Sequence, residues 1–151
     1  MKSIALCLMS LISTCTWAEE VCTRNSMRID VCRVATGLSQ SIANELPLRL
    51  SQSLVLQHIA ASENLIRMRA VFDYTETHLI KNLRTGTTLD TMKTSVRDTA
   101  VVMACRPKTE LQAFIDLGGK LQFIYLFSDK AHFLTVNVDH CTPQQDTKAL
   151  Q

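Results

Sequence analysis

The sequence predicts a two-layer α+β domain, in which an antiparallel sheet of about four strands packs against helices. Some segments repeat apolar residues every three or four positions, which is typical of amphipathic helices, and others at every second position, which is typical of half-buried strands. The segments follow one another in the order α-β-β-α-α-β-β. Because a short turn joins each pair of strands, we expect two β-hairpins in one sheet, with helices on one face.

Residues 26–46 are predicted to form the first helix. Its apolar positions are spaced by three and four residues: Met27, Val31, Val34, Leu38, Ile42 and Leu46. Asn25 or Ser26 can cap its start, because a short polar side chain accepts a hydrogen bond from a backbone N–H of the first turn. Pro47 ends it, because the residue before a proline is disfavoured in helical geometry.

The first hairpin is expected at residues 52–74. Residues 52–60 are apolar on both faces, which implies cover on both sides, by the protein's own helices or by a partner. Residues 62–64 form a turn. Residues 65–74 alternate more cleanly and predict a half-buried strand, with one face made of Ile66, Met68, Ala70, Phe72 and Tyr74.

Two further helices are expected in the middle of the chain. The polar residues 75–88 predict an irregular loop or a short helical turn. Thr87 and Asp90 resemble a capping box. The helix that follows has its apolar positions at Leu89, Met92, Val96, Ala100 and Met103. Pro107 suits the first position of a third, shorter helix, which the two glycines at 118–119 end.

A second hairpin closes the domain. Leu121, Phe123, Tyr125 and Phe127 occupy one face of its first strand. Residues 128–131 form the turn, and the last strand has its alternating residues at His132, Leu134, Val136 and Val138. The polar tail at residues 142–151 follows.

The N-terminus predicts export. Lys2 precedes an apolar run at residues 4–12, and small residues surround a cleavage site after Ala18. The run is too short to span a bilayer, which takes about 20 residues. We therefore expect a signal peptide at 1–18 and one periplasmic domain at 19–141. The alternative is lipidation at Cys15, because residues 11–15 half resemble a lipobox, and this would make an outer-membrane lipoprotein. Only in that case do we expect contact with a membrane.

The charge balance bounds the class of partner. The chain has 16 Lys and Arg residues against 14 Asp and Glu residues, a net charge of +2. Nucleic-acid binding requires a dense basic face. We therefore expect no nucleic-acid partner. Because the N-terminus predicts export, we expect a protein or peptide partner to lie in the cell envelope.

Four cysteines remain outside the signal peptide: Cys22, Cys32, Cys105 and Cys141. Four cysteines allow three pairings, and nearness in sequence favours Cys22 with Cys32 and Cys105 with Cys141. Disulfides persist in an oxidising compartment, which agrees with export. The alternative is a zinc site with four thiolates, but closely spaced cysteine pairs are absent.

The sequence carries no catalytic pattern. Its histidines, His58, His78, His132 and His140, are too far apart to form a local metal-ligand pair. A couple between His140 and Cys141 would need a free thiol, which the favoured pairing removes. The carboxylates are scattered, and no nucleophile, phosphate-binding or redox motif is present. We therefore predict a protein that is not an enzyme, with no cofactor and no metal site.

One strand face is a candidate partner-binding surface. Leu65, Arg67, Arg69 and Val71 alternate with the buried positions of their strand. They form either a solvated sheet face or a binding face on which arginines flank aliphatic side chains.

The order of elements resembles the small α/β pilotin, or S protein, of bacterial type II secretion. The resemblance covers residues 34–141 and rests on the helix that closes on Pro47, the two strands after it, Cys105-Arg106-Pro107, the short helix before Gly118, and the hairpin before Cys141. It implies a non-enzymatic adaptor that binds a C-terminal segment of the secretin subunit, with Cys105 and Cys141 as a structural disulfide. Those proteins are lipoproteins, and the pair Cys22 and Cys32 lies outside their pattern.

Three hypotheses of function follow. The first is an envelope adaptor or chaperone that binds a peptide segment of a secretion component. The second is a periplasmic inhibitor or immunity protein that inserts residues 75–88 into an enzyme cleft. The third is a module that binds a small apolar ligand between sheet and helices.

Overall fold

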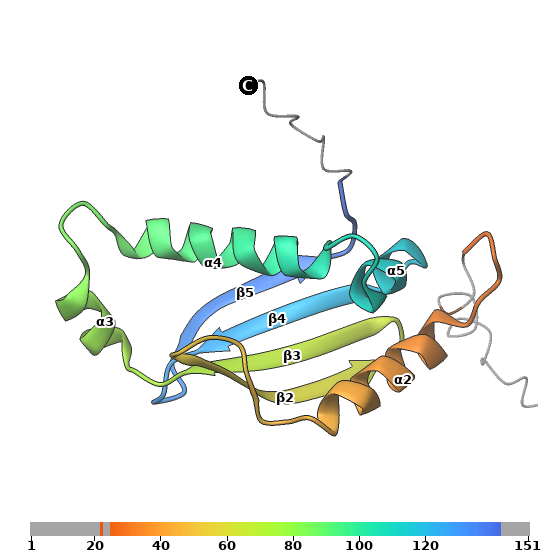
Figure 1. Cartoon of the computed structure of the whole chain (residues 1–151), viewed down its shortest axis with the longest axis horizontal. Coiled ribbons are helices and arrows are strands. Elements are labelled where there is room, and N and C mark those ends of the chain that lie inside the picture. The colour runs from red at the N-terminus through yellow and green to blue at the C-terminus, as the bar shows by residue number, and fades with distance from the viewer. Residues whose placement is uncertain (1–21, 23–24, 143–151) are drawn as a thin grey trace, which may run out of the picture.

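The computed structural model describes Cys22 and residues 25–142, in which a sheet of five strands is covered by helices on one face (Figure 1). The predicted signal peptide at 1–18 and most of the predicted tail at 142–151 lie outside the described residues. The elements are α2 (Val31–Ala43), β1 (Leu48–Arg49), β2 (Leu54–Ser62), β3 (Leu65–Phe72), α3 (Glu76–Asn82), α4 (Leu89–Ala104), α5 (Glu110–Asp116), β4 (Lys120–Leu126) and β5 (His132–Val138).

The predicted α+β class is confirmed, but the sheet is mixed rather than antiparallel. β2 with β3 and β4 with β5 form the two predicted antiparallel hairpins. The hairpins join through β3 and β4, which run parallel. Parallel neighbours require a long crossover, and α3, α4 and α5 supply it. A fifth strand, β1, pairs with β2, and it is too short for a periodic pattern to indicate.

A bulge explains why β2 is apolar on both sides. Leu56 and His58 pair with adjacent residues of β3, so Gln57 is an extra residue in β2. The alternation changes phase there, and Leu56 and Ile59 are both buried on the helix-covered face. The larger apolar residues Leu54, Leu56 and Ile59 therefore share one face across the bulge, and the half-buried Val55 lies on the other face.

α2 is shorter than the helix predicted at residues 26–46. It begins after Asp30, whose carboxylate accepts a hydrogen bond from the backbone N–H of Arg33 at 3.0 Å. Neither Asn25 nor Ser26 is the cap, so this prediction is wrong. Asp30 also places a negative charge at the positive end of the helix dipole. The helix ends three residues before the predicted boundary.

Threonines cap the three crossover helices. Thr75, Thr88 and Thr109 each accept a hydrogen bond from the backbone N–H three residues further on. α4 is therefore capped by Thr88 rather than by Thr87, and α5 begins three residues after Pro107 rather than at it. Both helices begin later than predicted, because the side chain of a threonine further along the chain accepts a hydrogen bond from the first turn.

Of the two expectations for residues 75–88, the helical one is right. α3 covers half of this segment, and its single buried residue is Leu79. A helix that buries one residue leaves almost no apolar period in the sequence, which is why the pattern there is weak.

Two glycines end α5, as predicted. Gly118 has φ of 92°, in the left-handed region that favours glycine. The backbone N–H groups of Gly118 and Gly119 donate to Ile115 O and Phe114 O, each at 2.9 Å. At Gly119 a Cβ would meet the ring of Phe114, which is fully buried. The first glycine is needed for its backbone angle and the second for space.

Both disulfides have the favoured pairing. Cys22 bonds to Cys32 in α2, and Cys105 at the end of α4 bonds to Cys141 after β5. The second disulfide closes a loop with a sequence separation of 36 residues and ties the helical layer to the edge of the sheet. No helix in the described part of the chain is both long and apolar enough to cross a membrane.

Candidate functional site

The helical layer leaves part of the sheet open, and an apolar cavity of about 130 Å³ lies there. We call this cavity and its rim the groove. Figure 1 shows α2 beside β2 and α4 beside β5, and the groove lies between these two helices. It is lined by Ile42, Glu45, Leu48, Leu50, Leu56, Met68, Ala70, Met103, Leu111, Phe123 and Tyr125.

The floor and the rim of the groove differ in exposure. The floor consists of side chains from β2, β3 and β4 that are buried, such as Leu56, Met68 and Phe123. The rim carries three large apolar side chains that are each about 36–37% exposed: Leu48, Leu50 and Met103. Exposed apolar residues that surround a buried apolar floor are a feature of binding grooves.

Tyr125 adds an aromatic ring to the lining of the groove. Its ring stacks with those of Phe72 and Phe123, at centroid distances of 6.3 and 6.5 Å. Burial raises the pKa of Tyr125 to about 12. The surface that faces the cavity is almost wholly apolar, so Tyr125 lines it with its ring rather than with its hydroxyl group.

The predicted partner-binding residues lie together on the opposite side of the sheet. We call that side the outer face, and it consists of the strand residues that point away from the helices. On β3 these are Leu65, Arg67, Arg69 and Val71; the two aliphatic residues are half-buried and the two arginines are exposed. None of these four residues lines the groove. Their role in binding stays a prediction.

Polar side chains form a ladder across the outer face. Arg67 Nε donates to Gln122 Oε1 at 3.2 Å, and Gln122 Nε2 donates to Asn137 Oδ1 at 2.9 Å. Gln122 and Asn137 are neutral, so this ladder orients the guanidinium group of Arg67 without compensating its positive charge. The cross-strand pairing places His58 beside Arg69 on the same face.

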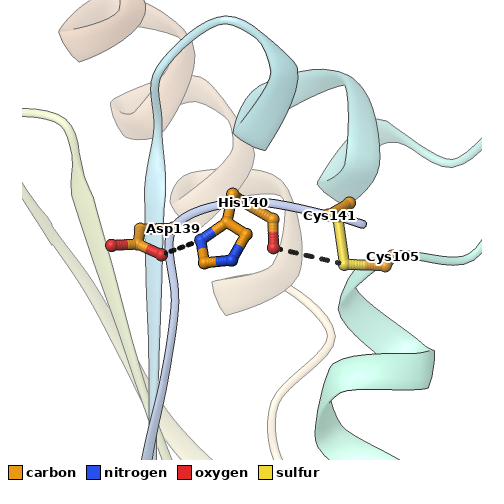
Figure 2. Close-up of polar contacts among 4 residues, drawn as sticks. All are labelled: Cys105, Asp139, His140 and Cys141. Atoms are coloured by element: carbon orange, nitrogen blue, oxygen red, sulfur yellow. Dashed lines mark hydrogen bonds and ion pairs between the residues drawn. A yellow bond between two sulfur atoms is a disulfide. The ribbon is translucent and has the colours of Figure 1, made fainter. Parts of the chain in front are cut away.

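The couple considered between His140 and Cys141 does not form. Figure 2 shows Cys141 bonded to Cys105, while His140 points to Asp139. His140 Nδ1 and Asp139 Oδ1 lie 2.6 Å apart, and their side chains are 82% and 62% exposed. The hydrogen bond from His140 lowers the pKa of Asp139. A solvated pair of this kind lacks the enclosed geometry of a catalytic site.

Two of the other histidines, His78 and His132, contact side chains away from this pair. His78 stacks on Tyr74 with a centroid distance of 6.3 Å, and His132 Nε2 lies 2.9 Å from Thr135 Oγ1. Among the described residues, Asp30 lies with Cys22 and Cys32 as a possible set of metal-ligating atoms. Both sulfurs of that set are in the disulfide bond, so they do not offer thiolates.

Two of the larger hollows are less suited to a ligand. One of about 770 Å³ follows an exposed face of α4, where Thr91, Thr94 and Ser95 are among the lining residues. The other, of about 470 Å³, lies next to the Cys105–Cys141 disulfide and contains the exposed pair of Asp139 and His140. Neither has a buried apolar floor like that of the groove.

The chain is similar to solved protein structures, but comparisons of its sequence give no match. No protein-family model matches the chain, and no curated protein matches its sequence. The pilotin EpsS of the Vibrio vulnificus type 2 secretion system superposes with a TM-score of 0.59 at 17% identity, over 76% of this chain and 94% of EpsS. The type II secretion pilotin AspS from Vibrio cholerae superposes with a TM-score of 0.55 at 17% identity, over 72% of this chain and 87% of AspS.

The chain has the fold of these pilotins. A protein from Pseudomonas aeruginosa described as a candidate secreted protein, PA3611, shares it with a TM-score of 0.55 at 12% identity, over 72% of this chain and 88% of that one. The resemblance inferred from the order of elements is therefore confirmed at the level of fold.

The sequence pattern did not reveal the groove. Its lining comes from α2, β1, β2, β3, α4, α5 and β4, so no single segment shows it. A signal was present in Leu48 and Leu50, which follow Pro47 and are apolar without belonging to a predicted element.

Proposed function

We propose that this chain is a non-enzymatic adaptor of the cell envelope that binds an apolar peptide segment of a secretion-apparatus component in the groove. The groove is the observation that carries the proposal. Its floor is buried and apolar, and Leu48, Leu50 and Met103 are exposed around it. The fold shared with the pilotins EpsS and AspS supports a role in secretion.

The size of the cavity favours a side chain over a free lipid. A cavity of about 150 Å³ holds one benzene molecule, and the cavity here is about 130 Å³. It therefore has room for one phenyl or leucine side chain. A peptide that inserts one such anchor and lays further apolar residues on the rim is the occupant that these dimensions support.

The chemistry of the rim suggests what else the segment carries. Glu45 is the one charged residue among those that line the groove, and the surface that faces the cavity is almost wholly apolar. We expect an amphipathic helix with apolar residues at spacings of three and four toward the floor. A basic residue near the exposed side chain of Glu45, at the edge of the groove, would complete the contact. The pilotin resemblance implies that the segment is the C-terminal part of a secretin subunit.

The inhibitor hypothesis is less supported by the geometry. It requires a projecting loop at residues 75–88, whereas α3 occupies half of this segment. We expect the protein to act in the periplasm, or at the outer membrane if Cys15 is lipidated.

A matched pair of variants on α4 tests the proposal. Met103→Glu places a charge on the rim, while Val102→Glu places the same charge at the neighbouring position, which is 59% exposed and does not line the groove. We expect Met103→Glu to weaken binding of a peptide from the C-terminal segment of the same genome's secretin by at least about tenfold, because a charge on an apolar contact is desolvated. Val102→Glu should stay within about twofold of the unmodified protein.

Calorimetry with this peptide and capture from envelope extracts provide the readouts. The proposal requires that the unmodified protein enriches a secretion component and that Met103→Glu does not. Equal enrichment by both proteins, or no binding of any secretin segment, would contradict it. Both substituted residues are exposed, so circular dichroism should show the same fold.

A further inference from the structure

The outer face concentrates positive charge. Arg49, Arg67, Arg69 and Lys120 belong to its cross-strand rows, in which Arg49 pairs with Val55 and Lys120 pairs with Leu65. These four cations exceed the net charge of +2 of the whole chain. The rest of the chain therefore has a net charge of −2, and the molecule is polarised between this face and its remaining surface.

Carboxylates are kept to the ends of this face. Asp73 follows β3, and Asp139 follows β5, where it is near enough to Lys120 for the lysine to contribute to its lowered pKa. Within the described strands, the outward positions include no Asp or Glu, and no described carboxylate forms an ion pair with the three arginines. The positive charges of Arg67 and Arg69, at the centre of the face, are therefore not paired with a carboxylate of the described part of the chain.

The arginines are placed to accept a partner. Arg67 and Arg69 are two positions apart on β3, and side chains at that spacing lie about 7 Å apart on one face. Arg67 uses one donor for Gln122, which leaves four of the five guanidinium donors. Adjacent like charges repel each other, so a negatively charged partner would relieve a repulsion as well as form hydrogen bonds.

We propose that the outer face is a second docking surface, which binds an acidic peptide segment of a protein partner. Arginine recognises carboxylates through paired parallel hydrogen bonds, which lysine cannot form. Half-buried aliphatic residues lie between the cations, such as Val71 and Ile124. This pattern fits a segment in which Asp or Glu alternates with apolar residues.

The shape of the face favours a peptide over an anionic membrane. Proteins that bind membrane surfaces insert exposed aromatic or large aliphatic side chains below the headgroups. The outward strand positions described here include no Phe, Tyr or Trp, and the large aliphatic residues among them are half-buried rather than exposed. The proposal is independent of the groove, because the two surfaces share no residue.

Two double variants of equal charge change test this surface. Arg67→Gln with Arg69→Gln removes two cations of the outer face. The control, Lys81→Gln with Arg84→Gln, removes two exposed cations at and just beyond α3, away from the sheet. The probe is a short synthetic peptide of alternating Glu and Val that carries a fluorophore, and a peptide of alternating Lys and Val serves as its counterpart.

We expect fluorescence anisotropy to show binding of the Glu peptide, no binding of the Lys peptide, and weakening of the complex by salt. The Arg67→Gln, Arg69→Gln protein should bind the Glu peptide at least about tenfold more weakly, while the control should change by less than about twofold. Equal loss in both variants would show attraction by net charge alone and would overturn the proposal. Absence of binding to the Glu peptide, or binding only to phosphatidylglycerol vesicles and not to phosphatidylcholine vesicles, would also overturn it.

Discussion

Among single residues, Gly119 leaves no room for a side chain. A methyl group at this position meets the ring of Phe114, which is fully buried at the end of α5. We expect Gly119→Ala to destabilise the protein by about 1–3 kcal/mol, because overpacking a filled core displaces its neighbours. The free energy of unfolding in urea measures this.

Gly37 provides the control for that substitution. It lies in α2, where a Cβ would meet no atom within 4 Å. Gly37→Ala should raise the stability by about 0.5–1 kcal/mol, because alanine loses less backbone entropy in a helix. A destabilised Gly37→Ala protein, or an unaffected Gly119→Ala protein, would contradict this account of packing.

The two tyrosines should ionise separately. Burial raises the pKa of Tyr125 to about 12. Burial and the nearby charge of Asp73 raise the pKa of Tyr74, while a hydrogen bond with Ser53 lowers it. The ultraviolet absorbance of tyrosinate should therefore rise in two steps at alkaline pH, and Tyr125→Phe should remove the later one. A single step at the ordinary pKa of about 10 in the folded protein would show that the Tyr125 hydroxyl is solvated.

The raised pKa of Tyr125 also predicts a loss of stability at high pH. The folded protein holds this proton more tightly than the unfolded chain does. The contribution is therefore complete below pH about 10 and is lost as the pH rises toward the folded value of about 12. One pKa unit corresponds to about 1.4 kcal/mol, so the loss is at most about 2–3 kcal/mol and is smaller where solvent screens the hydroxyl group. The free energy of unfolding in urea should fall less steeply with rising pH in Tyr125→Phe than in the unmodified protein.

Among the elements, the two disulfides should differ in their effect on stability. Cys105–Cys141 closes a separation of 36 residues and Cys22–Cys32 a separation of 10 residues. The chain-entropy estimate is about 3.8 kcal/mol for the longer loop and about 2.7 kcal/mol for the shorter. Replacing both cysteines of a pair by alanine should therefore cost about 1 kcal/mol more for the pair at 105 and 141.

Urea unfolding of the two variants under identical conditions measures the difference. The longer bridge also connects α4 with the end of β5. Its loss therefore frees a larger part of the fold than loss of the bridge between Cys22 and Cys32 of α2. The opposite order of stabilities would show that residual structure in the unfolded chain, rather than loop entropy, decides the effect.

Periodicity predicted most elements but not their pairing. The alternation at residues 65–72 and 120–126 is strong enough to identify both strands. It contains no information on direction, and the parallel pairing of β3 with β4 depends on the length of the crossover between them. Likewise, the bulge at Gln57 is a matter of register, which a single strand does not reveal.

Across the whole molecule, the two proposed surfaces differ in how far the sequence could predict them. The two central cations of the outer face lie on one strand, β3, where Arg67 and Arg69 alternate visibly with buried neighbours. The groove depends on the packing of seven elements, and its floor residues read in the sequence as ordinary core. The sites that a sequence reveals are therefore those on one element, whereas concave sites require the fold.

The placement of the two surfaces on opposite sides of one sheet leads to a prediction about the whole protein. The groove contains Met103 and Tyr125, and the outer face contains Arg67 and Arg69, with no residue in common. Two partners should therefore bind at the same time. A saturating amount of the Glu peptide should leave the affinity for the secretin segment unchanged within about twofold, because sites without shared contacts are energetically independent.

A double-mutant cycle makes this independence quantitative. Met103→Glu should weaken only the secretin segment, and Arg67→Gln with Arg69→Gln should weaken only the Glu peptide. In the combined variant each peptide should lose the same affinity as in the single variant that affects it, within about 0.5 kcal/mol. Competition between the two peptides, or a coupling well above that value, would mean that one surface serves both. In that case the molecule would hold a single partner rather than connect two, and binding to the sheet would have to be assigned to one face alone.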